Sequence, residues 1–483
     1  MKERFLALGE YGAAGLYEEC NRGLFYRKSL GLRRYFEHCE PPLYNGNLLY
    51  PSGVVTPKMT IRPHFHYGLY PCSQKFNKSE PKLVQKLTEE FCVFCSTIPP
   101  EHTVAGNMWI HSMPNYERIL SEGLLSYIPR IEKIADADMR EGLLHLVAGI
   151  RSYVERCVEY LKSVSADEKL IAALSQVPLY PARDIHEAIV GWNFIMYLDN
   201  CDNLGALGRG LLPYYNGENI IPLLENLYDN IDKNDGYSMS LDVNDVSLTV
   251  QCLKAAHGKR RPMIELFVDE DTSEEIWQAA FETVFSGGGQ PAFYNKKVLF
   301  SGLKKRFSNI RDADFKRFCG GGCTESMLAG LSAVGSVDAG INLLLILEQM
   351  MRSHLSSAKS FEEFYEDYLE EVKAVVENVK REISNSRRLR SRLNPAPMRT
   401  LLIDDCIDNE KEYHSGGARY NWSIINFAGM INVIDSLLSI KGLVFEEKKY
   451  TPEELLSLLA ANDDGFLTEV IERGETYGKD NED

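Results

Sequence analysis

The sequence lacks any hydrophobic run long enough to span a membrane. Its most apolar stretch, residues 341–347, contains Asn342 and is followed by Glu348, whereas a membrane-spanning helix needs ~20 mostly apolar residues. The amino terminus, MKERFLALGE, also lacks the apolar segment and small-residue cleavage site of a secretory signal. We therefore expect a cytoplasmic protein without a membrane span.

Cysteines that could form a disulfide framework or a metal knuckle are also missing. The sequence has 11 cysteines, an odd number, and they show no compact spacing. Cys319 and Cys323 are four residues apart rather than three, and no second Cys/His pair follows them nearby. Without an export signal, free thiols in a reducing compartment are expected, and no bound metal.

An excess of basic charge is absent as well. The 53 Lys and Arg against 69 Asp and Glu give a net charge of −16. Such a field repels phosphate backbones and anionic lipid surfaces, which argues against nucleic acid or a membrane as partners.

What is present is an ordinary globular composition, 44% hydrophobic and 25% charged, without internal repeats or an obvious linker. At ~150 residues per domain the length would allow about three domains, but we expect one large domain over residues 1–483.

Periodicity predicts a helix-rich α/β protein. Apolar residues recur every three or four positions in 360–386, where Ser360 and Glu363 suggest a capping box. Thr451, Pro452 and Glu454 form a second helix start. Residues 239–253 alternate like a strand, and the prolines of residues 40–76 indicate loop and edge strand. Further helices are predicted at residues 81–95, 113–125, 140–164, 184–197 and 272–284.

Three glycine-rich turns interrupt this pattern, at residues 286–291, 319–325 and 415–421. None has the spacing of a phosphate-binding loop, GxxxxGK[ST]. In the middle turn Cys323 and Glu325 are two residues apart, so an extended chain points both side chains to one side. A thiol beside a carboxylate suits a sulfur that acts as nucleophile or hydrogen carrier, with an acid–base partner. A lone cysteine is more often a small buried apolar residue, so both interpretations stay open here. The histidines at 111, 186, 257, 354 and 414 are scattered and expected to be structural.

The segment GCTE at residues 322–325 resembles the active-site loop of glycyl radical enzymes. QPAFYN at 290–295 and DAGIN at 338–342 are similar to that family's flanking motifs, as is GGARYN at 416–421 with Asp405 and Cys406 before it. These segments occur in the same order as in the family, and the resemblance extends from about residue 46 to residue 477. Other matching segments are NGN at 45–47, residues 111–124, 207–215 and 432–447.

The resemblance implies a ten-stranded α/β barrel of two half-barrels, incomplete in this chain, with helices around it and the cysteine loop at its centre. Cys323 would become a thiyl radical that takes a hydrogen atom from the substrate, and Glu325 would be the general base or proton relay. The Glu also argues against the pyruvate formate-lyase branch, which has two adjacent cysteines at this place; Cys319 is expected to be structural. Asp338 would grip a substrate hydroxyl or ammonium.

Other substrate contacts are implied at positions where the family's diol dehydratases bind their substrates. His64 and His66 occupy one such place, although an HxH pair also suits a surface metal site. Asn203 and Leu204 replace a His-Ser pair of the diol dehydratases, which argues against a glycerol-like or propanediol-like substrate. A radical lyase or dehydratase acting on a small polar substrate is therefore expected.

The family's glycyl radical motif, R-V-x-G-Y, does not occur in the sequence. A split enzyme with a second chain, a truncated product, or a non-catalytic relative serving as a binding or scaffold protein would each explain this. We favour the split enzyme, because Cys323 and Glu325 are kept as the family has them. The chain itself would then bind no cofactor. Its partners would be a separate glycyl-radical subunit and an activating radical S-adenosylmethionine enzyme, within an oligomer.

Overall fold

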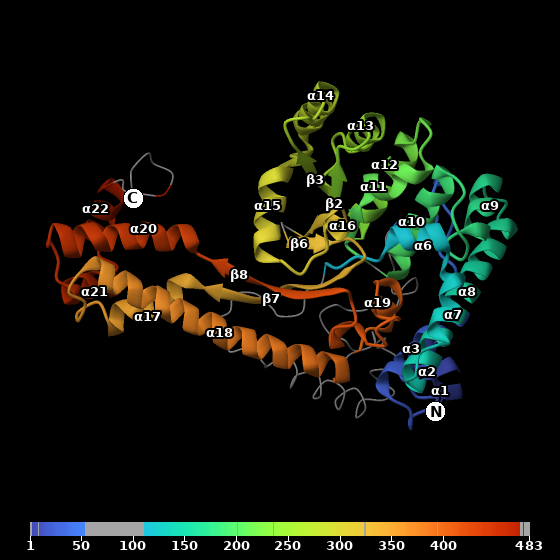
Figure 1. Cartoon of the computed structure of the whole chain (residues 1–483), viewed down its shortest axis with the longest axis horizontal. Helices are drawn as coiled ribbons and strands as arrows, with labels where there is room; N and C mark the ends of the chain where they lie inside the picture. Colours follow the sequence, from blue (N-terminus) through green and yellow to red (C-terminus); the bar gives the residue numbers. More distant parts are fainter. Residues whose placement is uncertain are drawn as a thin grey trace. The chain divides into compact units, whose positions relative to one another are not determined.

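The computed structural model describes residues 2–7, 9–53, 111–199, 201–234, 236–322, 325–393, 395–473 and 477. These residues form a mixed α/β chain (Figure 1), which confirms the predicted class. The chain divides into two compact units. The first comprises the described residues up to 336 together with 387–422, and the second comprises 337–386 and the described residues from 423 onward.

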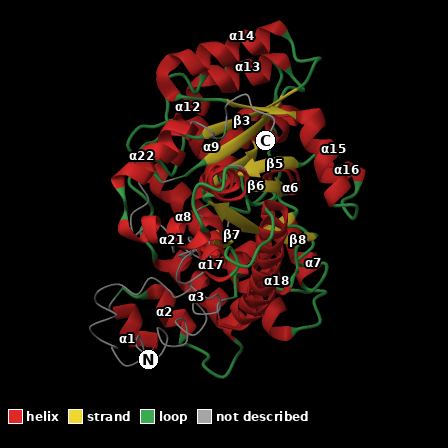
Figure 2. Cartoon of the chain, turned by 90° about the vertical axis from the view of Figure 1, so that its left-hand side faces the viewer, coloured by secondary structure: helices red, strands yellow, loops and turns green. Residues whose placement is uncertain are grey.

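The first unit contains a short parallel sheet, seen among its helices in Figure 2. Its strands lie in the order β1 (Asn203–Ala206), β2 (Ser238–Asp242), β3 (Met263–Val268) and β4 (Ala292–Asn295). Helix α13 (Val246–Lys254) connects β2 to β3, and α14 (Glu274–Thr283) connects β3 to β4. Strand β3 reads MIELFV and is almost wholly buried, as expected for a parallel strand covered on both faces.

Strands β5 (Phe318–Gly321) and β6 (Glu325–Leu328) form an antiparallel hairpin beside this sheet. Its register places Gly321 opposite Glu325, and β5 contacts β1 and β2. The hairpin turn holds Cys323 and Thr324, which lie outside the described residues.

The helices of the first unit surround these strands. They are α1 (Lys2–Ala7), α2 (Tyr11–Leu16), α3 (Leu24–His38), α6 (Tyr116–Glu122), α7 (Ile128–Ile131), α8 (Ala137–Ser163), α9 (Glu168–Gln176), α10 (Ile185–Asp199), α11 (Leu207–Leu211), α12 (Ile221–Lys233), α15 (Lys296–Arg306), α16 (Asp312–Phe315) and α19 (Pro397–Leu402), with α13 and α14. Helix α10 is buried on all sides and is mostly apolar, with Glu187, Asn193 and Asp199 among its buried polar residues.

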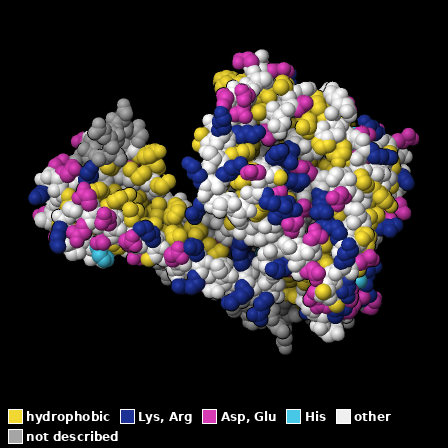
Figure 3. Space-filling view, viewed as in Figure 1, with side chains coloured by type: hydrophobic (Ala, Val, Ile, Leu, Met, Phe, Trp, Pro, Cys, Tyr) yellow, Lys and Arg dark blue, Asp and Glu magenta, His cyan; other side chains and the backbone are white. Residues whose placement is uncertain are grey.

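The second unit packs helices around one apolar cluster. Its helices are α17 (Leu343–Ser353), α20 (Met430–Ile440), α21 (Pro452–Ala461) and α22 (Asp464–Arg473). Strands β7 (Ser332–Asn342) and β8 (Tyr420–Ala428), which pair, and helix α18 (Phe361–Leu393) each begin in one unit and end in the other. The cluster includes Ile346, Phe364 and Leu443. Apolar side chains also remain exposed near the end of β8 and the start of α20 (Figure 3), namely Phe427, Met430 and Ile431.

The predicted helices at 113–125, 140–164, 184–197 and 272–284 are present with shifted ends, the last with Ser273 as its N-cap. The helix at 81–95 lies outside the described residues. Thr451 and Glu454 form the expected capping box. At Ser360 only half of the box forms, because the Glu363 carboxylate accepts from the amide of Lys359 instead.

The strand predicted over residues 239–253 is wrong in its second half. After β2 ends at Asp242, the side chain of Asp245 accepts a hydrogen bond from the amide of Leu248 and starts α13. An N-cap of this kind satisfies a free amide of the first helical turn. No helix in the described ranges is long and apolar enough to cross a membrane.

Candidate functional site

The three glycines before Cys323 sit where no side chain would fit. A methyl group placed on Gly320 would lie 1.7 Å from Oε2 of Glu265, and one on Gly321 would lie 2.6 Å from the Met327 thioether. At Gly322 the backbone has φ +57°, and a methyl group there would lie 2.5 Å from Nε2 of His111. A side chain at Gly320 or Gly321 would therefore displace Glu265 or Met327, and the left-handed backbone at Gly322 favours glycine.

Glu325 begins strand β6 with only 8% of its surface exposed. The point that a methyl group on Gly322 would occupy is 2.7 Å from Oε2 of Glu325. The carboxyl group therefore reaches back to the residue that directly precedes Cys323. Cys323 itself lies outside the described residues, so its predicted role stays a prediction.

His111 approaches the same glycine and is held by Asp202. Its Nδ1 lies 2.6 Å from Oδ2 of Asp202, and the side chains of the two residues are only 7% and 13% exposed. Because a carboxylate only accepts, Nδ1 carries the hydrogen and Nε2 faces Gly322. This imidazole and the Glu325 carboxyl thus converge on one backbone position.

Asn203 supports the backbone of the loop. Its Nδ2 donates to the carbonyl oxygen of Gly320 at 3.0 Å, and its Oδ1 accepts from the amide of Gly205 at 2.7 Å. The side chain is fully buried. These contacts give it a structural task beside the loop, and the predicted contact with substrate stays a prediction.

Beneath the hairpin, Ser240 and Glu265 occupy facing positions on the paired strands β2 and β3. The amide of Gly320 donates to Oγ of Ser240 at 3.0 Å, and this hydroxyl donates to Oε2 of Glu265 at 2.9 Å. Burial raises the pKa of Glu265 to about 8, and the charge of the nearby Glu325 adds to the rise.

The predicted roles of Asp338, His64 and His66 stay predictions. Asp338 belongs to the second unit, is buried, and accepts a hydrogen bond from Oγ of Ser423. His64 and His66 lie outside the described residues. Cys319 is buried against Met113, and burial raises the pKa of its thiol well above the usual value, which suits a packed, unreactive sulfur.

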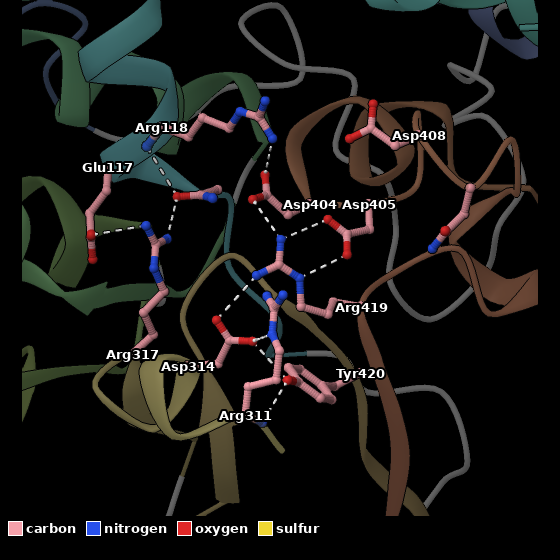
Figure 4. A network of polar contacts seen from close by, with 12 residues as sticks. Glu117, Arg118, Arg311, Asp314, Arg317, Asp404, Asp405, Asp408, Arg419 and Tyr420 are labelled. Atoms are coloured by element: carbon pink, nitrogen blue, oxygen red, sulfur yellow. Dashed lines mark hydrogen bonds and ion pairs between the residues drawn. The ribbon is translucent and has the colours of Figure 1, made fainter. Parts of the chain in front are cut away.

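The motif at residues 416–421 forms a brace of ion pairs in the first unit (Figure 4). Nε and Nη2 of Arg419 bind the two carboxylate oxygens of Asp405 at 2.7 and 2.8 Å, and Nη1 lies 3.2 Å from Asp314. Asp314 also accepts from the hydroxyl of Tyr420 at 2.7 Å. These contacts connect residues 405–420 to Asp314 on α16.

Sequence reasoning missed His111, Asp202 and Glu265. His111 stood within a family-like segment but was expected to be structural, and neither carboxylate had a motif around it. Among the residues that the structure describes, no group of three or more His, Cys, Asp or Glu is arranged to hold a metal ion.

The fold is that of glycyl radical enzymes. A solved structure of a glycyl radical enzyme from Archaeoglobus fulgidus superposes with a TM-score of 0.82 at 17% identity, covering 98% of this chain and 74% of that one. Its similarity concerns the fold alone.

The chain belongs to the pyruvate formate lyase-like family, whose profile matches residues 240–483, just over half of the sequence. Trans-4-hydroxy-L-proline dehydratase of Clostridioides difficile is 28% identical over 260 residues, which cover 50% of this chain and 32% of that enzyme. The 4-hydroxyphenylacetate decarboxylase glycyl radical subunit of Clostridium scatologenes is 24% identical over 416 residues, covering 69% and 46%. The chain thus spans about a third to a half of the length of these curated relatives.

Proposed function

We propose that this chain carries the thiyl radical of a glycyl radical lyase or dehydratase acting on a small polar substrate. The observation that carries the proposal is the convergence of Glu325 and His111 on Gly322, next to the family's cysteine position. One group is a carboxylate and the other an imidazole held by a second carboxylate, Asp202. A carboxylate and an imidazole close together can serve as general base and general acid when a bond next to the radical carbon is cleaved.

In the proposed reaction the Cys323 thiyl takes a hydrogen atom from a substrate carbon that bears a hydroxyl or amine. Glu325 accepts the proton of that group, which lets the leaving group on the neighbouring carbon depart with its bonding electron pair. His111, when its imidazole is doubly protonated, donates the Nε2 proton to the leaving group, and the proton that Glu325 accepted returns to Nε2 before the next turnover. The Cys323 thiol then returns the hydrogen atom to the product radical, which restores the thiyl.

The buried surroundings of the loop support radical chemistry. His111, Glu325, Asn203 and Glu265 are all nearly or fully buried, and a closed site limits side reactions of reactive intermediates with water. Asp338 is proposed to orient a hydroxyl or ammonium of the substrate, with His64, His66 and Asn203 as further contacts.

The radical is proposed to come from a separate glycyl-radical chain, oxidised by a radical S-adenosylmethionine activase. One relative is a glycyl radical subunit of a 4-hydroxyphenylacetate decarboxylase, which supports an enzyme made of more than one chain. The assembled enzyme is proposed to be an oligomer in which this chain binds no cofactor.

The test is anaerobic co-expression with a candidate glycyl-radical chain and its activase, followed by electron paramagnetic resonance. A glycyl doublet and turnover of small hydroxylated or amino compounds are expected. Cys323→Ser and Glu325→Gln should keep the glycyl doublet and abolish turnover, whereas Cys20→Ser, at an exposed cysteine, should keep both. Turnover by Cys323→Ser would overturn the thiyl mechanism.

A further inference from the structure

Asp199 is a buried carboxylate that the proposed reaction does not use. It is the last residue of α10 and has no exposed surface. Neither of its oxygens accepts a hydrogen bond from the part of the chain that the structure describes. Burying a carboxylate without such donors is costly, and at the C-terminal end of a helix a negative side chain faces the negative end of the helix dipole. A carboxylate in this place therefore needs a nearby cation.

The cation that opposes this charge is Arg399 of α19. Its Nε lies 3.2 Å from Oδ1 of Asp199, and the two side chains are only 5% and 0% exposed. Helix α19 belongs to residues 387–422, so this ion pair joins the late segment of the first unit to α10. Burial raises the pKa of Asp199 to about 6, and the charge of Arg399 opposes this rise. The carboxyl group is therefore mostly ionised at pH 7.5.

The same guanidinium acts on Asp202, the carboxylate that holds His111. Asp202 follows Asp199 by three residues, and its charge interacts with the charges of both Arg399 and Asp199. One of its oxygens, Oδ2, lies 2.6 Å from Nδ1 of His111. The other, Oδ1, is buried and accepts no hydrogen bond from the described residues. Asp202 therefore has an oxygen that a neighbouring cation can attract.

Two further titratable side chains near this ion pair stay neutral. Burial raises the pKa of the Cys201 thiol and that of the Tyr116 hydroxyl well above their usual values. Neither group therefore adds a charge to the surroundings of Asp202. The balance between Asp199 and Arg399 remains to act on it.

We propose that Asp199 is a positioning residue, which neutralises Arg399 and so leaves the Asp202 carboxylate to His111. Without the charge of Asp199, the guanidinium would attract Asp202, and the hydrogen bond that Nδ1 of His111 donates to Asp202 would weaken. With it, Arg399 can join α19 to α10 without competing for the carboxylate that orients the imidazole. The consequence for catalysis rests on the proposed function, but the effect on the hydrogen bond does not.

Nuclear magnetic resonance of the full chain with isotope-labelled histidine tests this at pH 7.5, without radical, substrate or partner. A proton on Nδ1 that is held by a buried carboxylate resonates far downfield, and His111→Asn identifies the resonance by its loss. Asp199→Asn keeps the size of the side chain and should move this resonance upfield. Glu187→Gln removes a buried carboxylate from the same helix, together with its ion pair to Arg183, and should leave the resonance in place.

The two halves of the ion pair should have different effects. Arg399→Met removes the charge that competes for Asp202, so the resonance should stay at least as far downfield as in the wild type. Combining Asp199→Asn with Arg399→Met should return the resonance from its upfield position. If Asp199 only joined α10 to α19, both single variants would shift the resonance alike, and the double variant would not restore it.

In the assembled enzyme, Asp199→Asn should lower kcat by about five- to tenfold, the effect of weakening one charge-assisted hydrogen bond, and the double variant should recover most of this loss. An unchanged resonance in Asp199→Asn, or an equal upfield shift in Arg399→Met, would overturn the proposal. Where Asp199→Asn does not fold, an upfield shift in both Arg399→Met and the double variant would overturn it as well. Unchanged kcat with the expected shifts would count against the proposed function alone.

Discussion

At the scale of single residues, the site combines groups from distant parts of the sequence. His111 precedes α6, Asp202 precedes β1, and Glu325 begins β6. The Asp202 carboxylate fixes which imidazole nitrogen bears the hydrogen, and the second nitrogen faces Gly322. A histidine oriented by a carboxylate is a common arrangement for general acid–base catalysis.

Replacing His111 by Asn should lower kcat of the assembled enzyme by about 10²- to 10⁴-fold, the usual contribution of a positioned acid or base. Asp202→Asn should lower kcat less, because the imidazole remains. The glycyl doublet should persist in both variants. His257→Asn, at an exposed histidine, is the matched control. Full activity of His111→Asn would contradict the proposed proton transfer to the leaving group.

The position of Glu325 close to the cysteine loop could be predicted, but the surroundings of this carboxyl group could not. Cys323 and Glu325 belong to one short segment, so their spacing and the family-like flanks were enough to select them. His111, Asp202 and Glu265 meet the hairpin only through tertiary folding, and each is separated from it by many residues. Local sequence patterns carry no information about such contacts.

At the scale of elements, the β5–β6 hairpin contains a run of glycines whose missing side chains leave room for its neighbours. Three consecutive glycines allow β5 to lie against Glu265, Met327 and His111. Glycine weakens an isolated strand, so the hairpin owes its order to the contacts from β1, β2 and β3. This is the physical reason why a glycine run stands inside regular structure here.

Gly320→Ala should destabilise the protein, because its methyl group would overlap the Glu265 carboxyl group. We expect a loss of about 1–3 kcal/mol, as for overpacking of a core, measured by urea unfolding at pH 7. Gly320→Ala combined with Glu265→Ala should recover part of this loss. Gly302→Ala, on α15 with open space around it, should be neutral or stabilising by up to about 1 kcal/mol. Equal stability of Gly320→Ala and the wild type would show that the Glu265 carboxyl group does not pack tightly against Gly320.

Helices were predicted well from periodicity, with or without a cap, whereas the alternation over residues 239–253 predicted a strand that is only half present. Ser273 and Thr451 mark helices that the structure confirms. The apolar residues of 239–253 continue to alternate after β2 ends, and only the N-cap Asp245 distinguishes the helix that follows. A cap is a local hydrogen-bonding device, so it is the better guide at such a boundary.

At the scale of the whole molecule, both units are assembled from separated stretches of chain. Residues 387–422 return to the first unit after the chain has passed through part of the second. Arg419 secures this return by its contacts with Asp314, and Arg118 adds a contact to Asp404 at 3.3 Å. The late segment therefore completes a unit whose other parts lie much earlier in the sequence.

Arg419→Gln should lower the free energy of unfolding by about 1–3 kcal/mol, because it leaves the carboxylate of Asp405 without its bidentate donor and removes one contact of Asp314. Urea unfolding with and without 0.5 M NaCl measures this. Arg151→Gln, which breaks an exposed pair with Glu155 on α8, should change little. A similar small effect of both substitutions would mean that the network contributes no more than a surface ion pair.

The returning segment also sets an order of events on the ribosome. The hairpin residues emerge long before residues 387–422, which supply Arg419 and the first residues of β8, where Trp422 donates to the carbonyl oxygen of Ser326 at 3.2 Å. Until those residues are translated, the nascent first unit lacks these contacts, and the β5–β6 hairpin is made before they can form. Slow translation across the intervening helices would prolong the interval in which the hairpin lacks its contact with Trp422.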